Sequence, residues 1–350
     1  MKYGGSMTSA ERVKAALSLK EPDRVPWLLL LTMTGARELG LSIKDYFSSG
    51  KNVAEGQLRM RAKYGHDVLY SFFFAALEME AWGGEVIYCD DGPPNCGAPV
   101  IKSPEAIETL SPPRIEDSPS LLKVLDATAK MKEGAGGEVP VLGVVISPFS
   151  LPVMQMGFEP YLLLLYERPE LFKRLMEVNE EFAAAWGRAQ LKAGADAICY
   201  FDPVSSPTII PRELYLKTGF PVAKRTVPAI GGPLAAHFAS GRCIPLIDDL
   251  VAAGIGAMCA GCEEDLARVK RASEGKIALV GNLNGLEMRS WTPGRAEEEV
   301  KKAIRAGGPG GGFLLSDSHG EIPWQVPDDV LSAMSEAVRK QGRYPLEAEG

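Results

Sequence analysis

Short apolar runs alternate with amphipathic segments along almost the whole chain. The runs are rich in Val, Ile, Leu and aromatic residues, as buried strands are, and the segments between them place apolar residues at helical spacing. Eight strands with intervening helices and no interdomain linker predict a single α/β domain over residues 1–350, folded as a TIM (β/α)8 barrel. The expected strands are 24–31, 66–74, 139–146, 196–201, 232–237, 255–259, 276–281 and 312–316.

Two segments are expected to be additions to this barrel. Residues 1–22 should form an N-terminal helical extension, with Ser9 as the cap of its helix. Residues 80–105 combine short apolar pieces with Gly83-Gly84 and Gly92-Pro93-Pro94, which is typical of a hairpin insertion.

An open, doubly wound sheet is the alternative fold. That fold favours a glycine-rich phosphate loop after an early strand, and no G-x-G-x-x-G sequence occurs there. The glycine cluster at 307–312 comes late and lacks the Lys-Ser/Thr of a P-loop, so it is interpreted as a turn before the last strand.

Charge and composition narrow the classes of partner and location. The net charge of −7, the pI near 5.3 and the lack of a basic run argue against nucleic acid as a partner. The apolar runs are too short to span a membrane, and the first residues lack the apolar core of a signal peptide. The six cysteines show no disulfide-scaffold spacing, which favours reduced thiols and a cytoplasmic location.

Polar side chains gather where the expected strands end. Two of the three histidines, His237 and His319, are at such positions, and in a barrel these strand ends converge on one rim. Imidazole together with thiolate suits Zn²⁺, and a catalytic zinc uses three protein ligands. His237, Cys262 and His319 are the predicted zinc ligands, with Cys259 or Glu321 as substitutes. The alternative interpretation of the cysteines is that they are small buried residues near a turn.

Several short motifs occur in a set order and spacing along nearly the whole chain. They are Glu21–Pro26, Ser147–Pro152 with Met156-Gly157, Ala193–Ala197, Ser205–Tyr215, Leu246–Gly254 and Gly310–Ser316. Through these motifs the sequence resembles the uroporphyrinogen decarboxylase superfamily, in its corrinoid-linked methyltransferase branch, and the resemblance implies a TIM barrel.

The chain departs from that superfamily at two places. The decarboxylase has an Arg-Gln-Ala-Gly-Arg segment that holds porphyrinogen carboxylates, whereas Leu30–Arg37 here lacks paired arginines, so porphyrinogen decarboxylation is not expected. Methyltransferases that act on coenzyme M have His-x-Cys and a later Cys as zinc ligands. Here Ala239 and His319 replace the two thiolates, and the chain therefore looks more like the O-demethylases of the branch.

The resemblance implies transfer of a methyl group from an O-methyl substrate to cob(I)alamin on a separate corrinoid protein. The expected donor is a small methoxylated aromatic, with zinc acting as a Lewis acid on the ether oxygen. Asp202 is the candidate for a carboxylate that orients the substrate or a zinc ligand. The candidate substrate-binding residues are Trp27, Met33, Phe73 and Asn282.

Three other functions remain as alternatives. The first is the reverse direction, from a methylcorrinoid to a thiol or folate acceptor. The second is decarboxylation of a smaller acid. The third, of a different class, is a catalytically silent barrel that binds a corrinoid protein, which the loss of both thiolates would favour.

Overall fold

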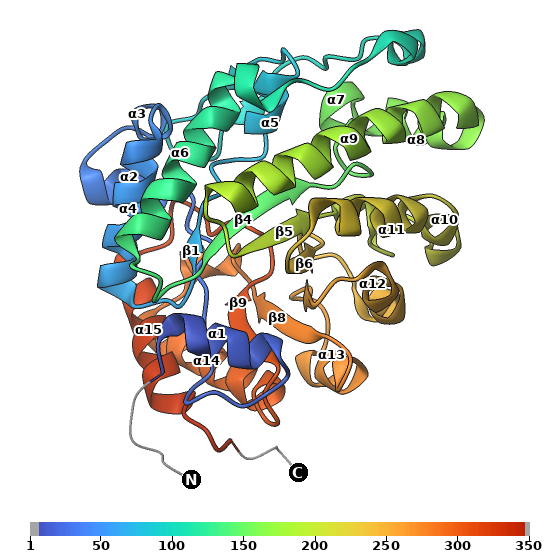
Figure 1. Ribbon diagram of the computed structural model, residues 1–350. Helices are drawn as coiled ribbons and strands as arrows, with labels where there is room; N and C mark the ends of the chain where they lie inside the picture. The colour runs from blue at the N-terminus through green and yellow to red at the C-terminus, as the bar shows by residue number, and fades with distance from the viewer. Residues whose placement is uncertain (1–6, 347–350) are drawn as a thin grey trace.

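Seven parallel strands form a curled sheet at the centre of the computed structural model, which describes residues 7–346 (Figure 1). Their spatial order is also their order along the chain, as expected when each strand follows its neighbour through a helical crossover. The strands are β1 (Leu69–Tyr70), β4 (Val141–Ile146), β5 (Ala197–Phe201), β6 (Leu234–His237), β7 (Ala257–Cys259), β8 (Ala278–Leu283) and β9 (Phe313–Asp317).

The first expected strand, 24–31, lies between β9 and β1 but forms only two isolated bridges, a parallel one from Trp27 to Leu315 and an antiparallel one from Arg24 to Arg343. The amide of Leu28 donates to the Leu315 carbonyl at 2.9 Å, and the amide of Asp67 donates to the Trp27 carbonyl at 2.8 Å. Pro26 has no N–H, and the Trp27 amide bonds to the Asp67 carboxylate instead of a neighbouring strand. The segment therefore fills the place between the two edge strands, consistent with a TIM-like barrel, without a regular ladder.

Helices surround the outer face of this sheet, and α6, α9, α11, α12 and α13 follow one another around one side of it in Figure 1. The helices on this and the other sides are α1 (Ser9–Leu17), α2 (Thr34–Leu39), α3 (Ile43–Phe47), α4 (Gly50–Tyr64), α5 (Leu77–Ala81), α6 (Pro119–Gly134), α7 (Pro152–Met156), α8 (Phe158–Glu167), α9 (Pro169–Ala193), α10 (Arg212–Lys217), α11 (Gly219–Ile230), α12 (Ile247–Ala253), α13 (Leu266–Ser273), α14 (Pro293–Gly307) and α15 (Asp328–Gln341). None of the helices in this described part is long and apolar enough to cross a membrane.

A small antiparallel hairpin stands apart from the main sheet. It pairs β2 (Val86–Ile87) with β3 (Asn95–Cys96), within the segment 80–105 where the turn residues predict a hairpin. Its strands are only two residues long, because most of the segment is irregular.

The sequence predicts Ser9 as the N-cap of helix α1, but the structure shows that Thr8 is the cap. The Thr8 side chain accepts from the Glu11 amide, and the Glu11 side chain accepts from the Thr8 amide, which is a complete capping box. Ser9 is the first helical residue, and its hydroxyl donates to the buried Asp67.

The interior of the barrel follows from the alternation of side chains along each strand. Leu28, Tyr70, Val144, Cys199 and Val280 belong to one apolar cluster inside the barrel, which α1 contacts through Val13 and Ala16. The neighbouring positions on the same strands face the helices and form the larger outer core. Successive side chains of a strand point to opposite faces, so this alternation decides which residues at the strand ends face the interior.

Candidate functional site

Unpartnered polar atoms concentrate at the C-terminal ends of β6 and β9. Buried polar atoms normally have a hydrogen-bond partner, so an unpartnered atom suggests that something else binds there. Among the described residues, the buried side-chain atoms without a partner include four at these two strand ends: His237 Nε2, Ser316 Oγ, Asp317 Oδ1 and His319 Nδ1. These four atoms lie at the rim where the sequence predicts the site, and a bound polar molecule there could act as their partner.

His237, the last residue of β6, is buried at the centre of this rim. Its ring stacks on Phe201 of β5, with ring centroids 5.4 Å apart and an interplanar angle of 26°. Its Nδ1 accepts a hydrogen bond from the Ala239 amide at 3.1 Å. Burial, with a smaller contribution from His319, lowers the pKa of His237 to about 4, so the ring is neutral at neutral pH.

The loop after β9 brings His319 next to His237. Asp317 Oδ2 accepts from the amides of His319 at 2.9 Å and of Gly320 at 3.2 Å, which fixes this turn. Gly320 has a φ of +93°, and a Cβ there would lie 3.3 Å from His237 Cε1, so only glycine allows this close approach. Burial raises the pKa of Asp317 to about 6 and that of Glu321 to about 7.

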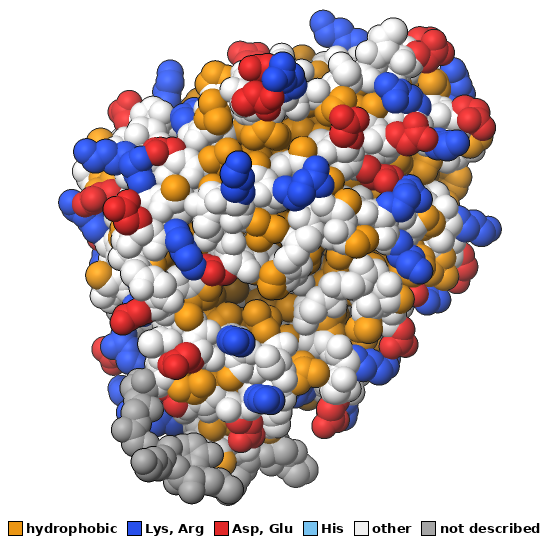
Figure 2. All heavy atoms as spheres, viewed as in Figure 1, with side chains coloured by type: hydrophobic (Ala, Val, Ile, Leu, Met, Phe, Trp, Pro, Cys, Tyr) orange, Lys and Arg blue, Asp and Glu red, His pale blue; other side chains and the backbone are white. Residues whose placement is uncertain are grey.

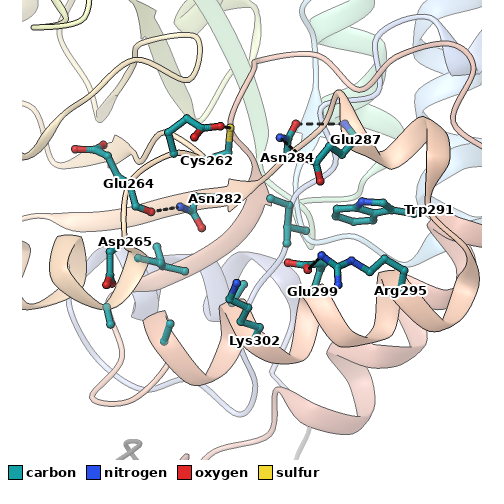
Figure 3. Close-up of a pocket in the computed structure, with 16 residues that line it drawn as sticks. Cys262, Glu264, Asp265, Asn282, Asn284, Glu287, Trp291, Arg295, Glu299 and Lys302 are labelled. Atoms are coloured by element: carbon teal, nitrogen blue, oxygen red, sulfur yellow. Dashed lines mark hydrogen bonds and ion pairs between the residues drawn. The ribbon is translucent and has the colours of Figure 1, made fainter.

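Cys262 and Asn282 line a separate cleft of about 580 Å³ beside the rim (Figure 3). The Asn282 amide donates to the carbonyls of Gly261 at 2.9 Å and Glu264 at 3.0 Å, so it holds the loop after β7. Cys262 Sγ lies 3.0 Å from Ser240 Oγ, near the rim. On the other side of the cleft are Trp291 and the ion pair of Arg295 with Glu299.

The residues present do not fit a zinc ion as they stand. Within residues 7–346, no group of three or more His, Cys, Asp or Glu is arranged to hold a metal. The third predicted ligand, Cys262, is hydrogen-bonded to Ser240, and the substitute Cys259 is buried within β7 inside the barrel. His237 also lacks an available lone pair for a metal ion. Its Nδ1 accepts a hydrogen bond, so the proton of the neutral ring is on Nε2.

Asp202, which follows β5, is buried and fully occupied by hydroxyl groups. Its carboxylate accepts from Ser147 at 2.6 Å, from Ser150 at 2.7 Å and from Ser205. Its backbone amide donates to the His237 carbonyl at 2.8 Å. The structure thus places Asp202 under the rim as an anchor for the loops after β4 and β5.

The three apolar candidates are all buried, and all three belong to the larger outer core and not to the cluster inside the barrel. Trp27 donates from its indole to the Gly65 carbonyl, at the N-terminal end of β1 and opposite the rim. Phe73 stacks on Phe47 of α3, with centroids 5.5 Å apart. Met33 caps α2 and packs in the outer core.

Phe72 and Phe201 are aromatic side chains that pack with the inner cluster near the rim. The sequence suggested the run Phe72–Phe74 as a pocket wall and favoured Phe73 within it, but it did not single out Phe201. Phe72 contacts Tyr70, with centroids 5.6 Å apart, and both pack with the inner cluster. The alternation of side chains from Tyr70 to Phe72 was a usable signal, since it assigns Phe72 and Phe73 to opposite faces.

An apolar pocket of about 220 Å³ lies beside Phe201. Its lining side chains come from the end of β4, from α7, from the start of α8 and from the segment after β5, and include Ile146, Met154, Phe158, Val204 and Ile209. Phe201 also lines it, so one phenyl ring contacts both this pocket and His237.

The single arginine of Leu30–Arg37 does not point to this rim. The Arg37 guanidinium donates to the Val326 carbonyl at 3.2 Å and lies 4.8 Å over the Trp324 ring. It is therefore held on the α2 side of the molecule, and the segment supplies no cation for carboxylates at the rim.

Comparison with known proteins gives one family. A family model described as uroporphyrinogen decarboxylase (URO-D) matches residues 8–341. The chain is 25% identical over 355 residues to the uroporphyrinogen decarboxylase of Magnetococcus marinus, covering 96% of this chain and 98% of that one. The corresponding protein of Idiomarina loihiensis is 26% identical over 256 residues, covering 69% and 68% of the two chains.

Solved structures show the same fold at lower identity. A methyltransferase from Methanosarcina mazei superposes with a TM-score of 0.85 at 18% identity, covering 95% of this chain and 99% of that one. A B12-independent methionine synthase from Shewanella sp. W3-18-1 has a TM-score of 0.50 at 12% identity, covering 85% and 89%.

Proposed function

The chain belongs to the uroporphyrinogen decarboxylase family, and from that premise we propose that it is a methyltransferase of that family. The proposed reaction moves a methyl group from a small methoxylated aromatic to cob(I)alamin carried by a separate corrinoid protein. The observation that carries the proposal is the rim itself. Neutral His237, with an unpartnered buried nitrogen, stacks on Phe201, which also lines an apolar pocket. This combination suits an aromatic ring that bears an oxygen.

Two further observations favour methyl transfer over porphyrinogen decarboxylation. The structural neighbour with a TM-score of 0.85 is itself called a methyltransferase. In addition, Arg37 is held by Val326 and Trp324, so the segment that clamps carboxylates in the decarboxylase offers no guanidinium to the rim. A substrate with many carboxylates needs such cations to offset its charge.

In the proposed reaction the protein binds and orients the substrate, and the corrinoid carries out the bond-forming step. The bond between the methyl carbon and the ether oxygen breaks, and its electron pair stays on the oxygen. Cob(I)alamin supplies the electron pair of the new bond to carbon, and the aromatic product takes up a proton. The rim would hold the ring against Phe201, with the methyl group toward the open side from which the corrinoid approaches. Zinc has no part in this proposal.

The test is a methyl-transfer assay with the full chain. Cob(I)alamin and 2-methoxyphenol are incubated with the protein, and methylcobalamin formation is followed by absorbance. We expect methylcobalamin formation that depends on the protein. Its rate should fall at least about tenfold in Phe201→Ala, because the substrate ring would lose its contact with the Phe201 side chain. The matched control is Phe73→Leu, which changes an aromatic side chain that faces the helices.

Two results would contradict the proposal. One is the absence of methylcobalamin with a series of methoxylated aromatics while uroporphyrinogen is decarboxylated. The other is methyl transfer only from methylcobalamin to a thiol or a folate, which would establish the reverse direction.

A further inference from the structure

The hydrogen bond at His237 Nδ1 determines which tautomer the ring adopts. A backbone amide can only donate, so the Nδ1 that accepts from Ala239 at 3.1 Å carries no proton. The proton of the neutral ring must then be on Nε2. A metal ligand needs a lone pair at the bonding nitrogen, and ligating histidines usually donate from their other nitrogen to a carbonyl or carboxylate. His237 has the opposite arrangement.

The backbone turns sharply directly after this hydrogen-bonded amide. Ala239 has a φ of +47° and Ser240 a φ of +67°, in the left-handed region that residues other than glycine rarely adopt. Residues in this region persist where the surrounding structure requires them. The tautomer itself follows from the hydrogen bond that the Ala239 amide donates to His237 Nδ1.

The other nitrogen of the ring is a buried donor without a partner. His237 is 2% exposed, and its Nε2 has no hydrogen-bond partner. An unsatisfied buried donor is unfavourable unless a bound molecule or water accepts from it. The acceptor must be compatible with the surroundings, which are the Phe201 ring on one face and the polar loop after β9 at the edge.

We propose that His237 binds an oxygen atom of the substrate through its Nε2–H and is not a metal ligand. The ligand class is a small aromatic molecule that carries an ether, phenol or carboxylate oxygen. The assignment of the oxygen to a leaving ether rests on the proposed function, but the tautomer and the donor role do not. In methyl transfer, this hydrogen bond strengthens as negative charge develops on the oxygen, so His237 would stabilise the leaving group.

The first experiment measures the tautomer directly in the full-length protein. Histidine labelled with 15N gives different nitrogen shifts for a protonated and an unprotonated ring nitrogen, and His237→Gln assigns the signal. We expect Nε2 protonated and Nδ1 unprotonated, with no change when Zn²⁺ is added. Protonation at Nδ1, or a zinc-dependent shift together with zinc lost in His237→Gln by elemental analysis, would overturn the proposal.

The second experiment measures binding of 2-methoxyphenol, with toluene as the counterpart that lacks oxygen. One hydrogen bond contributes about 0.5–1.5 kcal/mol, which corresponds to about twofold to twelvefold in the dissociation constant. We expect His237→Leu to weaken the binding of 2-methoxyphenol by that factor and to leave the affinity for toluene unchanged. In His237→Gln the amide N–H keeps a donor, so affinity should stay within about threefold of wild type.

The outcomes separate this inference from the proposed function. Equal affinity of wild type and His237→Leu for 2-methoxyphenol, or no binding of it by wild type, would overturn the oxygen-binding role. If His237 has the expected tautomer and binding contribution but no methylcobalamin forms, only the proposed methyl transfer fails. The tautomer is read from the wild-type spectrum, and the variant His237→Gln serves only to assign the signal.

Discussion

At the scale of single residues, Glu78 is a carboxyl group in the core between α5 and the sheet. It is 3% exposed, and its Oε1 accepts from the Ile146 amide at 3.2 Å. Burial raises its pKa to about 8 from an ordinary value of 4.5. The neutral form is therefore favoured in the fold. This contribution to stability is complete below pH 4.5 and is lost as the pH rises through about 8.

Glu78→Gln should make stability less dependent on pH. The amide resembles the protonated carboxyl and does not ionise. We expect wild type to lose a few kcal/mol, at most about 5, relative to Glu78→Gln between pH 5 and pH 9. Urea unfolding at several pH values measures this difference. Glu80→Gln, at a less buried position on the same helix, is the control, and parallel pH curves for wild type and Glu78→Gln would contradict the prediction.

Asp202→Ala tests the role of a second buried carboxylate. Removing it leaves the hydroxyls of Ser147, Ser150 and Ser205 without their acceptor. Each unsatisfied group costs about 1–3 kcal/mol, so we expect a loss of about 3 kcal/mol or more in unfolding free energy. Calorimetry would measure it. Unchanged stability together with lost methyl transfer would instead support the substrate-orienting role that the sequence predicted.

At the scale of elements, one buried carboxylate joins α1, the segment after it and β1. Asp67 accepts from Arg12 at 2.7 Å, from Arg24 at 2.6 Å and from the Trp27 amide at 3.0 Å. Its side chain has no exposed area. Asp67 thus joins the start of β1 to two consecutive N-terminal elements that lie 40 or more positions earlier in the sequence.

Asp67→Asn should be strongly destabilising. Removal of one partner from a buried charge cluster typically costs about 3–5 kcal/mol, because the arginines lose their counter-charge. The control is Asp248→Asn, which removes an exposed ion pair with Lys276 and should cost about 1 kcal/mol or less. Both are measured by urea unfolding at pH 7. A similar small loss in the two variants would show that the cluster is not a structural anchor.

At the scale of the whole molecule, the N-terminal end of the barrel is incompletely filled. A cavity of about 490 Å³ lies between α1 and the strand starts, and Figure 2 shows hydrophobic side chains in a hollow on this face. Ala235 and Ala257 are among its lining residues. Small side chains at these inward positions leave space that α1 does not occupy.

Two neighbouring substitutions test this arrangement. Ala235→Val adds two carbons inside the cavity and should raise the free energy of unfolding by about 1 kcal/mol. Ala236→Val points to the packed helices, where extra volume should cost about 1–3 kcal/mol. Thermal unfolding compares the two variants. Effects of the same sign would contradict the alternation that assigns β6 to its two faces.

The sequence was sufficient for the order of elements, because that order depends on local patterns. The strand expected at 196–201 is β5, Ala197–Phe201, and the one expected at 312–316 is β9, Phe313–Asp317. The strand expected at 24–31 is reduced to two isolated bridges, and the Asp67 carboxylate takes the Trp27 amide. No local pattern contains a contact between residues 40 positions apart.

The sequence by itself also placed His237 and His319 at the same rim, because the ends of parallel strands in a barrel converge. Only the tertiary structure decided what surrounds them. It directs Trp27 and Phe73 toward other elements, occupies Asp202 with three serines and hydrogen-bonds Cys262 to Ser240. It also turns the Ala239 amide onto His237 Nδ1. Residue type and spacing predict which side chains can meet, but hydrogen-bond partners and the face of each side chain are fixed only by packing between distant segments.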